Sequence, residues 1–128
     1  MTGDTSQVDM EAWCTHIRRF AGYSKVYMKL SGGFSELGKE RLATTSAEQL
    51  AMRMKPWLNQ VFDAFPVGRI MFGSDWPVCN VRGPATEKSW SVWRDVVSIA
   101  LEQEGLDDDY SAEKIWSETA KEAYRIRV

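Results

Sequence analysis

The chain has 128 residues, of which 44% are hydrophobic and 27% charged, and its formal net charge is −2. This length allows at most one domain, and the balance is typical of a globular protein and excludes a disordered one. The slight acidity and the scattered basic residues give no electrostatic reason to bind nucleic acid, and no apolar run is long enough to span a membrane.

The cysteines and the single histidine do not suggest a metal site. Cys14 and Cys79 lie far apart, and neither has metal-ligand partners near it in sequence. The first residues resemble no targeting peptide, so we expect a reduced, cytoplasmic setting. His16 falls in the first predicted helix, beside its apolar stripe, and is interpreted as a structural or solvent-facing residue.

The first part of the chain predicts a helix and then a strand. Apolar residues recur at three- and four-residue spacing over residues 9–22, and Asp9 can cap the start of this helix. Residues 25–30 predict a strand that runs into Ser31-Gly32-Gly33. The two glycines suit a backbone that turns sharply or approaches a ligand closely.

A second helix follows a loop that extends to about Thr45. Ser46 with Gln49, or Thr45 with Glu48, predicts a capping box at its start. The apolar face of this helix continues to Phe65. Pro56 falls inside the pattern, so we expect it to kink the helix or to split it into two.

The next strand carries the main candidate site residue. Residues 69–72 form a short apolar run without polar alternation, which suits a strand buried on both faces. The turn Gly73-Ser74-Asp75-Trp76-Pro77 follows, and Pro77 requires the strand to end near Trp76. Asp75 is therefore expected at the carboxyl end of a parallel strand, where open α/β sheets and (β/α)8 barrels keep their chemistry.

Two helices are expected after the loop that begins at Val78. Gly105 ends the first of them, and an acidic run, residues 107–109, favours the N-terminus of the last, at about residues 111–125. The apolar face of the first consists of Trp90, Trp93, Val96, Val97, Ala100 and Leu101. Strands separated by helices indicate parallel crossover units. Two parallel strands alone leave both edges unpaired, so the sequence predicts a slice of a larger α/β sheet.

Three segments resemble the ending of a known family: residues 26–32, residues 69–78 and residues 115–124. The family is the amidohydrolase-related one (amidohydrolase 2), which includes sugar-lactone lactonases, dicarboxylate lactone hydrolases and metal-dependent decarboxylases. The pattern fits the lactonase-like branch, whose last two barrel strands read V-x-x-K-L-S-G and R-[IL]-M-[FW]-G-S-D-W-P-V. The resemblance covers the chain from about residue 10 to its end.

The resemblance implies an α/β fold: residues 1–128 would be the C-terminal part of a (β/α)8 TIM barrel, about strands seven and eight with their flanking helices. Asp75 would match the strand-eight aspartate, which serves as a metal ligand, as the general base that activates water, or as both. Ser31 and Trp76 would lie on the same rim and bind the small-molecule substrate. The cofactor implied for the full-length family is a divalent metal, zinc in the first instance, although some branches work without one.

The chain also departs from the family pattern. A (β/α)8 barrel takes about 250 residues, and the family's H-x-H on strand one and histidines on the middle strands have no counterpart here. A catalytic metal takes about three protein ligands. We therefore expect the isolated chain to bind no metal, to be catalytically inactive and to associate through its exposed sheet edges.

Two functional hypotheses remain. In the first, the chain is the C-terminal portion of a hydrolase acting on a sugar lactone or related cyclic ester, with a metal-dependent decarboxylase as the less favoured chemistry. In the second, it is a non-enzymatic half-barrel that assembles with another chain, and Asp75 only caps a turn.

Overall fold

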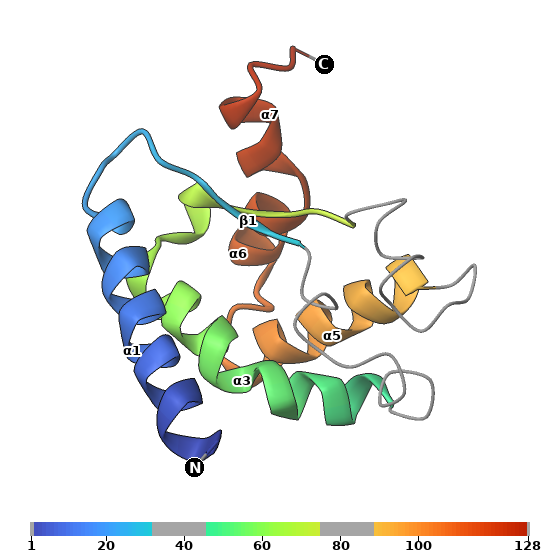
Figure 1. The fold of residues 1–128 in the computed structure, drawn as a ribbon. Coiled ribbons are helices and arrows are strands. Elements are labelled where there is room, and N and C mark those ends of the chain that lie inside the picture. The colour runs from blue at the N-terminus through green and yellow to red at the C-terminus, as the bar shows by residue number, and fades with distance from the viewer. Residues whose placement is uncertain (1, 32–45, 75–88, 128) are drawn as a thin grey trace.

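A computed structural model describes residues 2–31, 46–74 and 89–127 of the chain. Within them, helices and two strands alternate along most of the sequence (Figure 1). The elements are α1 (Thr2–Ala21), β1 (Met28–Leu30), α3 (Ala47–Ala64), the 3-10 turn η2 (Val67–Arg69), β2 (Ile70–Phe72), α5 (Ser89–Gln103), α6 (Asp109–Glu113), the π-helical turn η3 (Lys114–Glu118) and α7 (Thr119–Ala123).

The two strands form a parallel sheet, as the alternation of helices and strands predicted. Met28 pairs with Ile70 and Leu30 with Phe72. Each strand has three residues and is shorter than predicted, because the chain enters β1 through a turn and enters β2 through η2. The fold is therefore mixed α/β, with a crossover through α3 joining parallel neighbours.

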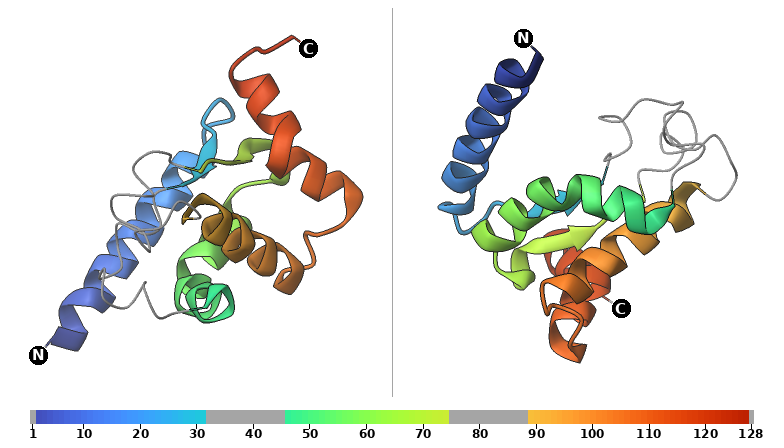
Figure 2. Two further views of the ribbon diagram at one scale, coloured as in Figure 1. Left: turned by 90° about the vertical axis from the view of Figure 1, so that its right-hand side faces the viewer. Right: turned by 90° about the horizontal axis from the view of Figure 1, so that it is seen from below.

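One continuous core lies between the sheet and the helices. Helices α3 and α5 pack side by side against the sheet, and η3 packs on β2 (Figure 2). Ile70, Val96, Val97 and Ile115 are completely buried in this core. Phe72 extends it toward the last helical segment, where its ring lies 4.7 Å from that of Trp116. Most residues of the apolar faces predicted for the helices are buried or half-buried, but Phe20, Trp57 and Trp90, which were also placed on these faces, are exposed.

Helix α1 begins earlier than predicted. The expected cap, Asp9, is wrong, because the helix starts at Thr2 and Asp9 lies inside it. Elongating a formed helix adds one hydrogen bond for each residue fixed, so an already nucleated helix extends through neighbouring polar residues at little cost. The predicted end holds: α1 stops at Ala21, just before Gly22.

Helix α3 confirms the first of the two capping boxes offered by its sequence. Ser46 Oγ accepts from the backbone N–H of Gln49, and the Gln49 side chain accepts from the Ser46 backbone N–H. Of the two outcomes expected at Pro56, the split into two helices is wrong, because α3 is one continuous helix from Ala47 to Ala64. Pro56 and Met52, whose carbonyl loses its partner, are both exposed, so water can satisfy that carbonyl.

The last helical segment runs from Asp109 to Ala123 and contains the π-helical turn η3. Thr119, which is fully buried, donates its hydroxyl to the carbonyl of Val67 at 2.9 Å. Ile115, also fully buried, lies within η3 itself. The wider turn therefore coincides with the residues that join this segment to the turn before β2.

Arg69 holds the chain on the amino-terminal side of β1. Its guanidinium donates to the carbonyls of Ala21 at 2.7 Å, Tyr23 at 2.7 Å and Val26 at 3.2 Å. Ala21 is the last residue of α1, so this cation also lies at the negative end of that helix. The ring of Phe65 packs 5.3 Å from the guanidinium carbon. Arg69 thus fixes the segment that leads from α1 into β1.

In the described stretches, each helix is too short or too polar to cross a membrane.

Arg69→Lys is expected to lower the free energy of unfolding by about 1–3 kcal/mol, because a single ammonium cannot reach three carbonyls that a planar guanidinium bonds together. Urea denaturation followed by circular dichroism measures this change. The matched control is Arg94→Lys, whose guanidinium makes one exposed ion pair with Asp95 at 3.3 Å. A control variant as destabilised as Arg69→Lys would contradict this role.

Asp108 gives a prediction about pH. The backbone N–H of Ser111 donates to its carboxylate at 2.9 Å and lowers the pKa of Asp108 below its ordinary value of 3.8. Since the folded pKa is the lower one, the ionised cap stabilises the chain above that ordinary value and is lost as the pH falls through the lowered pKa. Asp108→Asn still caps the helix without a charge, so its melting temperature should fall less steeply below pH 3.8 than that of the wild type. Equal slopes would contradict the assignment, and Asp107→Asn is the matched control.

Candidate functional site

The carboxyl ends of β1 and β2 lie next to each other at one edge of the sheet. The backbone N–H of Gly73 donates to the carbonyl of Leu30 at 3.0 Å, which extends the parallel pairing one residue past β2. The chain then continues into Ser31 from β1 and Ser74 from β2, and both serines are half-buried. The residue after Ser74 in sequence is Asp75, so the last described residues on both strands lead to the predicted site.

A tryptophan from α5 joins these two strand ends. The indole Nε1 of Trp93 donates to the carbonyl of Leu30 at 3.2 Å and to the carbonyl of Gly73 at 3.0 Å. Trp93 is 2% exposed, so these bonds are protected from water. The same donor therefore fixes where the backbone leaves β1 and where it leaves β2.

The sequence places Trp93 only on the apolar face of its helix and does not predict this contact. A signal was present, because a buried tryptophan has one N–H that requires an acceptor. Six tryptophans share that property in this chain. Which of them would meet the strand ends depends on how α5 packs, and sequence spacing does not contain that information.

The predicted site residues fall into two groups. Ser31 lies directly after β1, at the edge where the site was expected. Asp75 and Trp76 lie outside the described residues, as do Gly32, Gly33 and Cys79. Their side chains therefore stay predictions, and what the structure supports is the position of the strand end that leads to them.

His16 and Cys14 lie on α1, away from the strand ends. His16 is exposed, as its place beside the apolar stripe predicted. Cys14 is a free, buried cysteine. Both residues belong to the packing and surface of the first helix.

The described residues do not by themselves fit a metal centre. Among residues 2–31, 46–74 and 89–127, no group of three His, Cys, Asp or Glu side chains comes close enough to hold an ion. A catalytic zinc takes about three protein ligands. The described residues therefore offer no complete ligand set for such an ion.

A family model described as amidohydrolase matches residues 2–126. The chain therefore belongs to the amidohydrolase family, in agreement with the resemblance found at the two strand ends.

The curated proteins to which the chain is similar are named as sugar lactonases. It is 36% identical to the L-rhamnono-gamma-lactonase of Scheffersomyces stipitis, over 78% of this chain and 28% of that protein. It is 31% identical to an L-fucono-1,5-lactonase of Burkholderia ambifaria, over 65% of this chain and 26% of that protein. It is 29% identical to an L-fucono-1,5-lactonase of Burkholderia multivorans, over 96% of this chain and 38% of that protein.

The chain thus spans between about a quarter and two fifths of the length of these relatives. A comparison with solved structures gave no significant match.

Trp93→Phe is expected to lower the free energy of unfolding by about 1–3 kcal/mol, because it keeps an aromatic ring but removes the indole donor from the Gly73 carbonyl and leaves the Leu30 carbonyl with the Gly73 N–H alone. Urea denaturation measures the loss. Trp90→Phe on the same helix is the matched control: Trp90 is 42% exposed, and its replacement should change stability by less than about 0.5 kcal/mol. Equal effects of the two changes would contradict the role of the indole N–H.

Proposed function

We propose that this chain supplies the last two strands of a (β/α)8 barrel that hydrolyses a sugar lactone, with β1 and β2 as strands seven and eight. The observation that carries the proposal is the parallel pairing of β1 and β2, which brings Ser31 and Ser74 to one edge. Family membership and the similarity to sugar lactonases support the same reaction class.

Asp75 is assigned as the general base. A carboxylate at a strand end can accept a proton from water as the water oxygen attacks the lactone carbonyl carbon. The bond between the carbonyl carbon and the ring oxygen then breaks, and the ring oxygen takes up a proton, which gives a hydroxy acid. Ser31 and Trp76 are assigned to the wall of the substrate site, on the same rim as this acid.

A closed barrel requires strands in addition to β1 and β2. Each strand has one sheet partner within the described residues, so both outer edges offer unpaired backbone groups. Segments equivalent to the regions of the relatives that this chain does not match would pair with these edges and complete the site. The 128-residue chain alone is therefore expected to show no lactonase activity and to self-associate.

The test is a chimera in which this chain replaces the matched 38% of the Burkholderia multivorans lactonase. We expect the chimera to hydrolyse L-fucono-1,5-lactone, measured as acid release in a pH-indicator assay. A chimera that folds, as judged by its melting transition, and yet releases no acid would contradict the proposal. Release of carbon dioxide from a carboxylate substrate instead would favour decarboxylation.

Within the active chimera, Asp75→Asn is expected to lower kcat by about 10²–10⁴-fold, the range for loss of a general acid–base group. The matched control is Asp63→Asn, which changes an exposed acid on α3 and should leave kcat unchanged. If Asp75→Asn keeps the wild-type kcat, Asp75 has no part in the reaction and the reading of it as a turn cap holds.

A further inference from the structure

One face of the sheet is apolar, and the opposite face carries an exposed lysine beside a buried methionine. Met28, Leu30, Ile70 and Phe72 belong to the core or pack against it. Side chains alternate between faces along a strand, so the register partners Lys29 and Met71 lie on the opposite face. Lys29 is exposed within the described part of the chain, whereas Met71 is buried, with only 4% of its surface exposed.

Lys29 leans toward the carboxyl end of the neighbouring strand. Its register partner is Met71, yet its side chain passes over Gly73, two residues farther along. A Cβ on Gly73 would lie 3.2 Å from Cγ and 3.3 Å from Cδ of Lys29 and would overlap its Cε. The glycine thus provides the space in which the lysine stem lies along the sheet.

This direction carries the ammonium toward the strand ends. The stem reaches its Cε at Gly73, directly before Ser74 and on the side of the sheet where β1 ends at Leu30. Among the described residues, no hydrogen bond or ion pair is recorded that fixes the Lys29 ammonium elsewhere. A cation on a long stem, extended toward the proposed site, has three N–H donors for an oxygen-rich ligand.

We propose that Lys29 is a substrate-binding residue whose ammonium binds the carboxylate of the sugar hydroxy acid at the strand-end edge. This inference rests on the proposed function for the identity of the ligand. Ring opening converts a neutral ester into a carboxylate, and a fixed cation favours the charged form. Gly73 is a positioning residue for Lys29, because its missing side chain sets the path of the stem.

The competing explanation is that the lysine stem only covers Gly73. Lysine often lays its methylene groups over apolar surface while its charge stays in water. In that case its charge would have no effect on ligand affinity, and any long side chain would serve equally well.

The experiment is a titration of the 128-residue chain, and of the lactonase chimera, with the hydroxy acid formed from L-fucono-1,5-lactone. Binding is followed by the ε-methylene NMR signals of the lysines, and the Lys29 signal is assigned by its loss in Lys29→Met. We expect a saturable shift of the Lys29 signal. Lys29→Met should raise the dissociation constant about tenfold, as for the loss of one charge-assisted hydrogen bond, and Lys29→Arg should keep it within about threefold.

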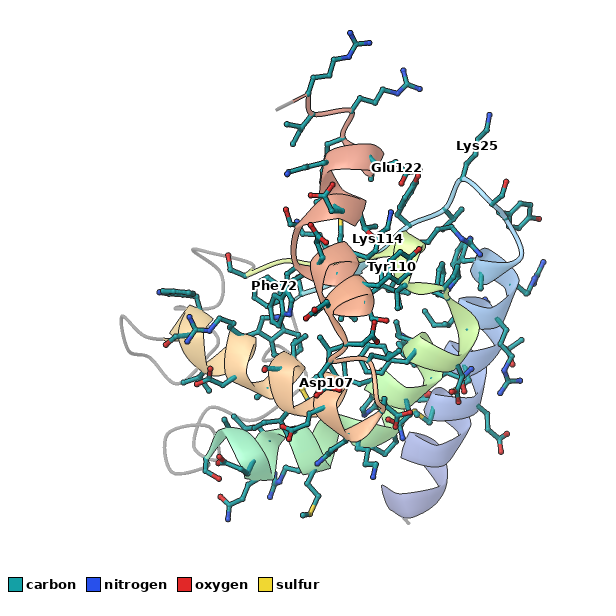
Figure 3. The ribbon with its side chains drawn as sticks, turned by 180° about the vertical axis from the view of Figure 1, so that it is seen from behind. Lys25, Phe72, Asp107, Tyr110, Lys114 and Glu122 are labelled. Carbon is teal, nitrogen blue, oxygen red and sulfur yellow. The ribbon has the colours of Figure 1, made fainter. Side chains whose placement is uncertain are left out.

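Lys25→Met is the matched control, since Lys25 is an exposed lysine that points away from the fold (Figure 3). It should leave the dissociation constant unchanged. Inorganic phosphate is titrated in parallel. Equal affinity for phosphate, or no Lys29 shift in either protein, would overturn the proposal.

Gly73→Ala separates position from charge. The atoms that the new Cβ meets belong to the far part of a flexible side chain, so the stem can move aside and the melting temperature should change little. Displacement of the ammonium should still raise the dissociation constant for the hydroxy acid. In the Lys29→Met background the same change should have no further effect. Additive effects would show that Gly73 acts independently of Lys29 and would overturn its positioning role.

The outcomes distinguish this inference from the proposed function. If the chimera is active and depends on Asp75, but Lys29→Met leaves its dissociation constant for the hydroxy acid unchanged, the lysine site alone is overturned. Lysine-dependent binding of the hydroxy acid by a chimera that folds but does not hydrolyse the lactone supports the lysine site and overturns the hydrolase.

Discussion

The bond pair from the Trp93 indole to the carbonyls of Leu30 and Gly73 is the constraint on which the candidate site depends. Strands of three residues make few ladder bonds, so their ends are not fixed by the sheet alone. The buried indole N–H from α5 links both strand ends to a third element of the fold. Because α5 packs on α3 across the core, the position of the strand ends is linked to the packing of helices distant in sequence.

The opposite end of the sheet is held in a comparable way. Arg69 gathers three carbonyls of the segment that leads from α1 to β1, and Thr119 bonds the carbonyl of Val67 in the turn before β2. Side-chain donors thus bind the backbone at both ends of a very short parallel pair. These bonds from outside the ladder add to the few bonds within it and help two three-residue strands to keep a defined register.

The sequence predicted those features that depend on neighbours along the chain. The Ser46–Gln49 capping box is local, and so is the end of α5 near Gly105, which has a positive φ of 69°. The prediction that Asp9 caps α1 is wrong, because a residue that can cap a helix does not prevent the helix from extending beyond it. The split expected at Pro56 does not occur, because water can reach the carbonyl that this proline leaves unpaired on the exposed side of α3. Of the site, the strand end and Ser31 could be located, whereas the contacts of Trp93 and Lys29 depend on packing between distant segments.

The asymmetry between the two faces of the sheet connects stability to chemistry. Leu30 and Ile70 are buried against the helices and fix the strands in place. The positions between them, Lys29 and Met71, lie on the opposite face, where Met71 is buried and Lys29 is exposed. A charged residue is tolerated there because burial of the other face already holds the strand, and Gly73 leaves room for its stem. The same alternation that specifies the register therefore directs a cation toward the carboxyl edge, where Ser74 leads into Asp75.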